Sequence, residues 1–265
     1  MKFLIGNKPT VSAIRLSGVI NSNKNGLSLQ NIAPALKKAF TVPNTKAVAI
    51  VINSPGGSPV QSSLIGKSIS RLSKEYKLPV FAFIEDVAAS GGYWLACAAN
   101  EIYADSNSIV GSIGVIGGGF GFSELIKKYG IERRIYTSGK NKAKLDPFMP
   151  ENSEDVNKIL DLQKEIHKNF IDHVKTNRGD RLIKDDEYLF NGDYWTGNTA
   201  LELGLIDGID DIGSFFRKKY SKDVKIRWIK TDNESWFKRI LGFETILDSL
   251  INKVETSLMM NRFGG

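Results

Sequence analysis

Cysteine and histidine are scarce in this sequence, and their scarcity excludes several classes of chemistry. Cys97 is the single cysteine, so no disulfide can form within the chain and a reducing compartment is favoured. His167 and His173 are the two histidines, and together with one cysteine in an unrelated segment they do not make a set of metal ligands. We therefore expect no metal centre.

Long apolar runs are also lacking. Nowhere do about 18 apolar residues follow one another, as a membrane-spanning helix would need, and the run Phe3-Leu4-Ile5 is far shorter than a signal-peptide core. These features predict a cytoplasmic protein. The 36 Lys and Arg residues against 29 Asp and Glu give a net charge of +7, but no segment is saturated with basic residues. Nucleic acid is therefore not expected as a partner.

The chain does contain apolar strands that are followed by glycine-rich turns. Apolar runs predict strands at 11–20, 46–52 and 78–84, and helical periodicity predicts helices at 29–40, 60–76 and 94–99. The order strand, glycine turn, helix occurs twice in succession. We therefore predict an α/β fold with a parallel sheet, in which both glycine turns emerge at one carboxyl edge, where active sites collect.

The second half of the chain continues with alternating elements and ends in a strongly apolar helix. We predict strands at 101–104, 133–137 and 224–229, and helices at 121–129, 153–177, 198–204, 212–220 and 236–258. Apolar residues cover more than half of the circumference of the last helix. This pattern predicts a main domain at 1–210 and a C-terminal extension at 211–265. The extension would contact neighbouring subunits, or alternatively a membrane surface.

Ser90 is the strongest candidate for a nucleophile. It follows the predicted strand at 78–84 and precedes a short helix, and Gly91 and Gly92 come directly after it. Glycine amides at a helix N-terminus can bind developing negative charge, as half of an oxyanion hole would. The alternative interpretation is a glycine-rich turn whose serine merely caps the helix.

A serine hydroxyl needs a base to accept its proton, and few candidates exist. His167 and His173 lie six residues apart on the predicted long helix and have no distinctive flanking motif, so a histidine triad is the weaker alternative. Lysine can act as the base where burial or neighbouring positive charge favours the neutral amine. Lys140, Lys142 and Lys144 alternate, so in an extended segment they would share one side, although an exposed basic loop would look the same. A Ser/Lys dyad is the catalytic arrangement for which the chain supplies all the parts.

Four motifs together resemble the signature set of a known family. They are Asn53-Ser54-Pro55-Gly56-Gly57, Ala89-Ser90-Gly91-Gly92-Tyr93-Trp94, Val110-Gly111-Ser112-Ile113-Gly114-Val115, and Ser138-Gly139 followed by Lys142. In this order, across roughly residues 11 to 210, they look like the signal peptide peptidase A (protease IV) family of serine peptidases, family S49.

The resemblance implies a fold and a set of site residues. The fold would be Clp-protease/crotonase-like, with repeated β-β-α units and a C-terminal helical extension. Ser90 falls on the family's nucleophile and Lys142 on its general base, four residues after Ser138. Ser112 matches the serine that orients the lysine amine, and the amides of Gly57 and Gly91 match the oxyanion hole.

The implied function is a serine endopeptidase that acts on peptide or unfolded-protein substrates, without a cofactor and as a homo-oligomer. Many family members begin with a membrane anchor, whereas this chain starts directly at the first predicted strand, so we expect a short form without an anchor. We expect a cytoplasmic location, and whether the protein also contacts the inner membrane peripherally stays open. Two other functions stay open: a crotonase-like acyl-CoA-processing enzyme, and a catalytically silent scaffold protein.

Overall fold

The computed structural model describes residues 8–231 of the chain. The helix predicted at 236–258 lies outside the described residues, and so does the choice between a subunit and a membrane contact for it. The described chain forms two compact units, one made of residues 8–114 and 170–231 and the other of residues 115–169. Each unit is described by itself.

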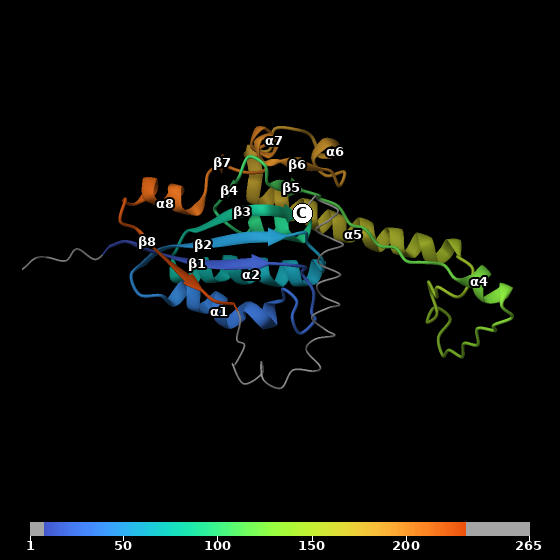
Figure 1. Cartoon of the computed structure of the whole chain (residues 1–265). Coiled ribbons are helices and arrows are strands. Elements are labelled where there is room, and N and C mark those ends of the chain that lie inside the picture. Colours follow the sequence, from blue (N-terminus) through green and yellow to red (C-terminus); the bar gives the residue numbers. More distant parts are fainter. Residues whose placement is uncertain (1–7, 232–265) are drawn as a thin grey trace, which may run out of the picture. The chain divides into compact units, whose positions relative to one another are not determined.

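The first unit is built on a mostly parallel sheet (Figure 1). Its strands are β1 (Thr10–Ser17), β2 (Thr45–Ser54), β3 (Val80–Ala89), β4 (Glu101–Ala104), β5 (Ile109–Gly111), β6 (Tyr194–Thr196), β7 (Gly208–Ile209) and β8 (Lys225–Ile229). They lie in the order β6-β5-β3-β2-β1-β8, and β4 pairs with both β3 and β7. All of these pairs are parallel except β5 with β6. The predicted parallel α/β sheet is confirmed.

Helices cover both faces of this sheet. The helices of the first unit are α1 (Leu29–Thr41), α2 (Pro59–Tyr76), α3 (Gly91–Ala96), α6 (Asp186–Leu189), α7 (Gly197–Glu202), α8 (Ile212–Lys219), the 3-10 helix η1 (Gly179–Arg181) and the C-terminal part of α5 (Ser153–Arg178). Buried side chains of α1, α2, α3 and α5 form one core cluster with β1, β2 and β3. On the opposite face, Phe215 and Phe216 of α8 pack against Phe81 and Phe83 of β3.

Serine caps begin the two helices that follow the first two strands. Ser28 accepts a hydrogen bond from the Asn31 amide at the start of α1, and Ser58 accepts one from the Gln61 amide at the start of α2. Pro59 occupies the first position of α2, where its missing N–H leaves no helical hydrogen bond unmade. These local signals explain why both helices begin close to the predicted residues.

The last described elements belong to the same sheet. β8 pairs in parallel with β1 from Lys225 to Ile229, and the Phe216 side chain of α8 is fully buried. Residues 212–229 thus complete the edge of the sheet next to β1 and part of its second face. The division of the chain at residue 210 stays a prediction.

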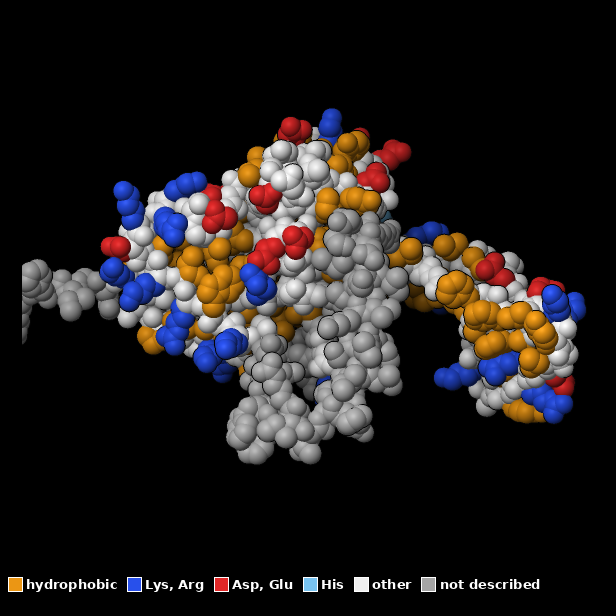
Figure 2. Space-filling view, in the orientation of Figure 1, with side chains coloured by type: hydrophobic (Ala, Val, Ile, Leu, Met, Phe, Trp, Pro, Cys, Tyr) orange, Lys and Arg blue, Asp and Glu red, His pale blue; other side chains and the backbone are white. Residues whose placement is uncertain are grey.

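The second unit contains α4 (Ser123–Lys128), the N-terminal part of α5 and turns. The strand predicted at 133–137 is wrong, because no strand is found among the described residues of this unit to pair with it. None of residues 115–169 is buried, and Figure 2 shows hydrophobic side chains on the surface of this unit. Its large exposed hydrophobic residues are Ile116, Phe120, Leu125, Tyr129, Ile131, Tyr136, Leu145, Phe148, Met149, Leu160 and Leu162.

Between residues 8 and 231, no helix combines the length and the apolar character that crossing a membrane would require.

Candidate active site

Ser90 lies at a strained turn directly between β3 and α3. β3 continues to Ala89, five residues beyond the predicted end at Ile84, and α3 begins at Gly91. The Ser90 backbone has φ 51° and ψ −120°, a conformation that residues other than glycine rarely adopt. Its carbonyl accepts a hydrogen bond of 3.0 Å from the Trp94 amide, but its side chain makes no capping bond to the helix. Ser90 thus stands at the N-cap position of α3, but its hydroxyl does not cap the helix.

The glycine turn after β2 packs directly against Ser90. Gly56 has φ +100°, and a Cβ at this position would lie 2.8 Å from the Ala89 carbonyl oxygen, the Gly91 nitrogen and Ser90 Cβ. A Cβ at Gly91 would lie 2.4 Å from Ser62 Oγ. Only glycine allows so close an approach of two backbone segments. The structure thus brings together the two glycine turns that the sequence placed at one sheet edge.

The amide of Gly57 points away from β1. The Ile20 amide donates to the Gly56 carbonyl and the Ser58 amide donates to the Ile20 carbonyl, each at 2.7 Å. Successive peptide groups of an extended chain point in opposite directions, so the N–H of the exposed Gly57 points to the other side. Because β2 lies between β1 and β3, this is the side of β3 and Ser90.

Ser112 lies beside Ser90. Ala89 and Gly111 are paired at the ends of β3 and β5, and the Ser90 amide donates to the Gly111 carbonyl at 2.8 Å. Each serine comes directly after its paired residue, and Ser112 also has a positive φ, of 52°. Its amide donates to the Asp193 carbonyl at 2.6 Å. The structure therefore brings Ser90, Ser112, Gly57 and Gly91 to one edge of the first unit.

Ser54 supports this edge, a role that was not expected from the sequence. The buried Ser54 hydroxyl donates to the Gly18 carbonyl at 2.7 Å and accepts from the Gly56 amide at 3.2 Å. It therefore ties the turn after β2 to the end of β1. A serine two residues after the apolar run at 46–52 was the available signal, since a buried hydroxyl requires partners nearby.

Lys142 lies in the second unit, in a segment that turns. Residues 140–145 form turns and not the extended segment considered for the alternating lysines, and the Lys142 amide donates to the Gly139 carbonyl at 3.1 Å. Gly139, with φ +103°, permits this turn. The Lys142 side chain is exposed, whereas Lys144 Nζ forms a salt bridge of 2.9 Å with Asp155. The ammonium group of Lys144 thus has a structural use.

His173 packs against α3 and forms a hydrogen bond with it. Its Nε2 lies 3.0 Å from the Trp94 carbonyl oxygen, which can only accept, so Nε2 carries the proton. Its Nδ1 then accepts from Asn177 Nδ2 at 3.3 Å, and the ring stacks on Trp94 with 4.6 Å between centroids. Burial lowers the pKa of His173. Since both ring nitrogens are engaged, His173 cannot accept the proton of Ser90. His167, like Lys142, lies in the second unit.

Cys97 is a core residue of the first unit. Its side chain is fully buried, and burial raises the pKa of its thiol to about 12. The neighbouring Tyr93, on α3, is also fully buried, which raises its pKa, and its hydroxyl donates to the Leu205 carbonyl at 2.7 Å. Tyr93 therefore anchors the helix that begins beside Ser90 to the loop after α7.

The chain is similar to known peptidases in sequence. The model of peptidase family S49 matches residues 73–225, a range that includes Ser90, Ser112 and Lys142. The chain is 33% identical over 217 residues to the chloroplastic serine protease SPPA of Arabidopsis thaliana, which covers 78% of this chain and 31% of that protein.

A second relative carries a different description. The chain is 53% identical over 224 residues to the Na⁺/H⁺ antiporter NhaA of Brucella abortus, which covers 83% of this chain and 30% of that protein. The chain thus spans about a third of the length of these two relatives, and the antiporter description is of the whole Brucella protein.

A solved structure shows the fold. A serine-to-alanine mutant of the 1510-N membrane-bound stomatin-specific protease superposes with a TM-score of 0.53 at 16% identity, covering 84% of this chain and 99% of that chain. The Clp-protease-like fold expected from the sequence is confirmed.

Proposed function

Because the chain belongs to peptidase family S49, we propose that it is a serine endopeptidase in which Ser90 and Lys142 form a catalytic dyad. The observation that carries this proposal is the strained turn at Ser90, with Gly56 packed against it. Strained backbone at the end of a central strand is typical of an exposed nucleophile. The hydroxyl is not used to cap α3, which further supports a chemical role.

The proposed reaction is acyl transfer. The Lys142 amine accepts the proton of the Ser90 hydroxyl. At the same time the Ser90 oxygen attacks the carbonyl carbon of the substrate peptide bond. The resulting ammonium group then gives a proton to the leaving amine, and an acyl ester remains on Ser90. Water, deprotonated by Lys142, hydrolyses this ester and regenerates both side chains.

The negative charge that develops on the carbonyl oxygen would be bound by the amides of Gly57 and Gly91. Two observations support this assignment: the Gly57 amide points to the side of β3, and Gly91 is the first residue of α3, where amides have no helical partner. Ser112 would orient the Lys142 amine. The pairing of β3 with β5, which sets Ser112 beside Ser90, supports this role.

Labelling with a serine-directed fluorophosphonate tests the dyad. We expect the full chain to be labelled, Ser90→Ala to give no labelling, and Lys142→Ala to slow it by roughly 100- to 10,000-fold, the usual contribution of a general base. Lys140→Ala is the matched control, because it removes an exposed lysine from the same segment, and it should leave the rate within about twofold.

Other outcomes would change the assignment. If Lys140→Ala and Lys142→Ala slow the labelling equally, the basic segment would act only through its general electrostatic effect, and Lys142 would not be the base. A folded wild-type chain that is never labelled would favour the acyl-CoA-processing or scaffold alternative. Labelling that persists in Ser90→Ala would put the nucleophile elsewhere.

We further propose that the substrates are peptides or unfolded protein segments, with a preference like that of signal peptide peptidases. The family membership supports this substrate class. The cytoplasmic location, with or without peripheral contact to the inner membrane, stays a prediction from the sequence.

A further inference from the structure

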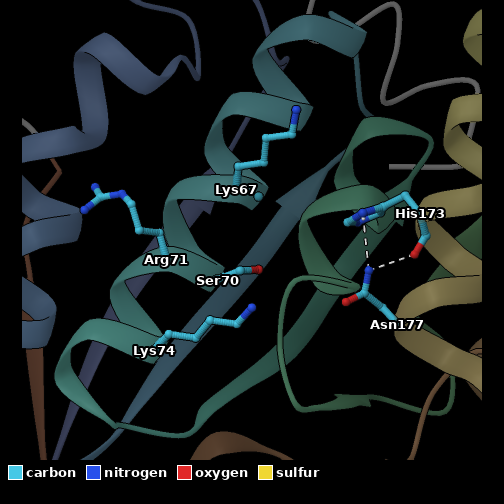
Figure 3. A pocket seen from close by; sticks show the side chains of 7 residues that line it. Lys67, Ser70, Arg71, Lys74, His173 and Asn177 are labelled. Atoms are coloured by element: carbon cyan, nitrogen blue, oxygen red, sulfur yellow. Dashed lines mark hydrogen bonds between the residues drawn. The ribbon is translucent and has the colours of Figure 1, made fainter.

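A groove of about 420 Å³ lies between α2 and the C-terminal part of α5 in the first unit (Figure 3). This volume is in the range of pockets that hold small molecules, about 300–1,000 Å³. None of the residues proposed for catalysis lines it. The lining residues are Gly66, Lys67, Ser70, Arg71 and Lys74 from α2, and His173 and Asn177 from α5.

The groove carries positive charge that carboxylates do not balance. Lys67 and Lys74 are seven residues apart, about two helical turns, so they lie on the same side of α2. Arg71 is paired with Glu75 at 3.0 Å, but within residues 8–231 neither Lys67 nor Lys74 has a carboxylate partner. A concave surface with uncompensated charge of one sign concentrates ligands of the opposite sign.

The donors are directed toward the space between the helices. Figure 3 shows Ser70 and Lys74 pointing toward α5, whereas Arg71 points the other way. The Ser70 hydroxyl has no hydrogen-bond partner in the described part of the chain, so it is free to donate to a ligand. One ammonium group and one hydroxyl therefore point into the space between the helices, and Lys67 lines the same groove.

Packing and hydrogen bonds define the floor and the far wall of the groove. Gly66 forms part of the floor, where a Cβ would lie 3.4 Å from Trp94 Cδ1 of α3. On the α5 side, Asn177 Nδ2 donates to the His173 carbonyl at 2.7 Å and to the ring Nδ1 at 3.3 Å. Burial and, to a smaller extent, the charge of Lys67 lower the pKa of His173, which favours the neutral form of the ring on this wall.

We propose that this groove binds a small molecule carrying two or more phosphate groups, held by Lys67, Lys74 and Ser70. Seven residues of helix separate the two lysines by about 10 Å along α2, which suits separate phosphate groups better than one compact anion. Lysine ammonium groups and serine hydroxyls are both ordinary phosphate ligands. The bound molecule would touch the floor over Trp94, one turn of α3 after Ser90.

Calorimetric titration of the full chain with inorganic tripolyphosphate, at about 0.15 M ionic strength, tests the proposal. The double change Lys67→Gln with Lys74→Gln should weaken binding about 100-fold, because it removes two charge-assisted hydrogen bonds worth about tenfold each. Ser70→Ala, which changes no charge, should weaken it about fivefold.

The matched control is Lys37→Gln with Lys38→Gln. These two exposed lysines of α1 do not line the groove, and their loss changes the net charge equally, so binding should weaken less than about threefold. All titrations can be repeated in the Ser90→Ala background. Binding there is independent of catalysis, so failure of this proposal and failure of the proposed dyad are distinguishable.

Three results would overturn the proposal. The first is the absence of tripolyphosphate binding to the wild-type chain. The second is equal weakening by the groove and control changes, which would indicate attraction by net charge alone. The third is that a hexaglutamate peptide binds more tightly than tripolyphosphate and that the double change at Lys67 and Lys74 abolishes this binding. This result would assign the groove to acidic polypeptides.

Discussion

The backbone of Ser90 adopts its unusual conformation because neighbouring strands hold it there. The Ser90 amide donates to Gly111 on one side, its carbonyl accepts from Trp94 on the other, and Gly56 leaves the space that its Cβ needs. A positive φ at a residue other than glycine costs on the order of 1–3 kcal/mol, which these contacts must offset. Residues around Ser90 are therefore expected to tolerate little change in volume.

The substitution Gly56→Ala tests how closely the residues around Ser90 are packed. The added methyl group would lie 2.8 Å from Ala89 O, Gly91 N and Ser90 Cβ, at a position with φ +100°. We expect the free energy of unfolding to fall by about 2–4 kcal/mol, as overpacking and backbone strain combine. Urea denaturation measures this loss. Fluorophosphonate labelling should also disappear, because Ser90 must move.

Gly118→Ala is the control for this substitution, since a Cβ there meets no atom within 4 Å. It should change the free energy of unfolding by less than about 0.5 kcal/mol. Normal stability and labelling of the Gly56 variant would contradict the close approach of the two turns.

At the scale of elements, one buried ion pair joins α5 to the sheet. The Arg178 side chain is 2% exposed, and its Nη1 donates to Asp207 Oδ2 at 2.7 Å. Its Nε and Nη2 both donate to the Gly204 carbonyl, at 2.9 and 2.7 Å. Asp207 also accepts from the Ile102 amide of β4 at 2.7 Å. This network therefore connects the end of α5, the loop after α7 and β4.

The pair makes stability depend on pH in a definite direction. Burial alone would raise the pKa of Asp207, but the hydrogen bonds and charge of Arg178 lower it below its ordinary value. A carboxyl group whose pKa is lower in the folded state stabilises the fold above its ordinary pKa. We therefore expect the free energy of unfolding to fall as the pH drops below about 4.

Asp207→Asn should remove this part of the pH dependence and leave Arg178 buried without its charged partner. The expected loss at neutral pH is about 3–5 kcal/mol. Thermal unfolding followed by circular dichroism between neutral and acid pH measures both effects. Asp180→Asn, on the exposed surface of η1, is the control. A variant as stable as the wild-type chain at neutral pH would contradict the role of this pair.

At the scale of the molecule, the second unit lacks a core of its own. Residues 115–169 include no buried side chain, yet eleven large hydrophobic residues in this range are exposed. Tyr136 and Phe120 are the most exposed, at 91% and 82%. Apolar surface of this extent marks an interaction site. The homo-oligomer expected from the sequence, which stays a prediction, would bury this surface.

The double change Phe120→Asp with Tyr136→Asp tests whether this surface lies in a subunit interface. Burying a charge in an apolar interface is unfavourable, so the double change should lower the mass measured by sedimentation equilibrium toward that of one chain. Ile183→Asp is the control, because Ile183 is an exposed apolar residue of the first unit. An unchanged mass would favour a cover made by residues of the same chain.

The sequence by itself determined the elements and the type of sheet. The predicted helices at 29–40 and 60–76 and the strand at 46–52 match α1, α2 and β2 within two residues at each end. Apolar periodicity, serine caps and glycine turns act over a few residues, so they can be interpreted without knowing the fold. The order of these elements then required a parallel sheet with both glycine turns at one edge.

Only the tertiary structure decided what depends on partners that are distant in the chain. β3 extends to Ala89 because its last residues pair with β5, and the segment 133–137 is no strand because no partner lies beside it. Contacts between distant segments also determine three side-chain and backbone features of the site region. These are the conformation of Ser90, the hydrogen bond of His173 to Trp94 and the salt bridge of Lys144. Hydrogen bonds and packing between distant segments select one backbone and side-chain arrangement from several that local sequence permits equally, so these features could not be predicted from it.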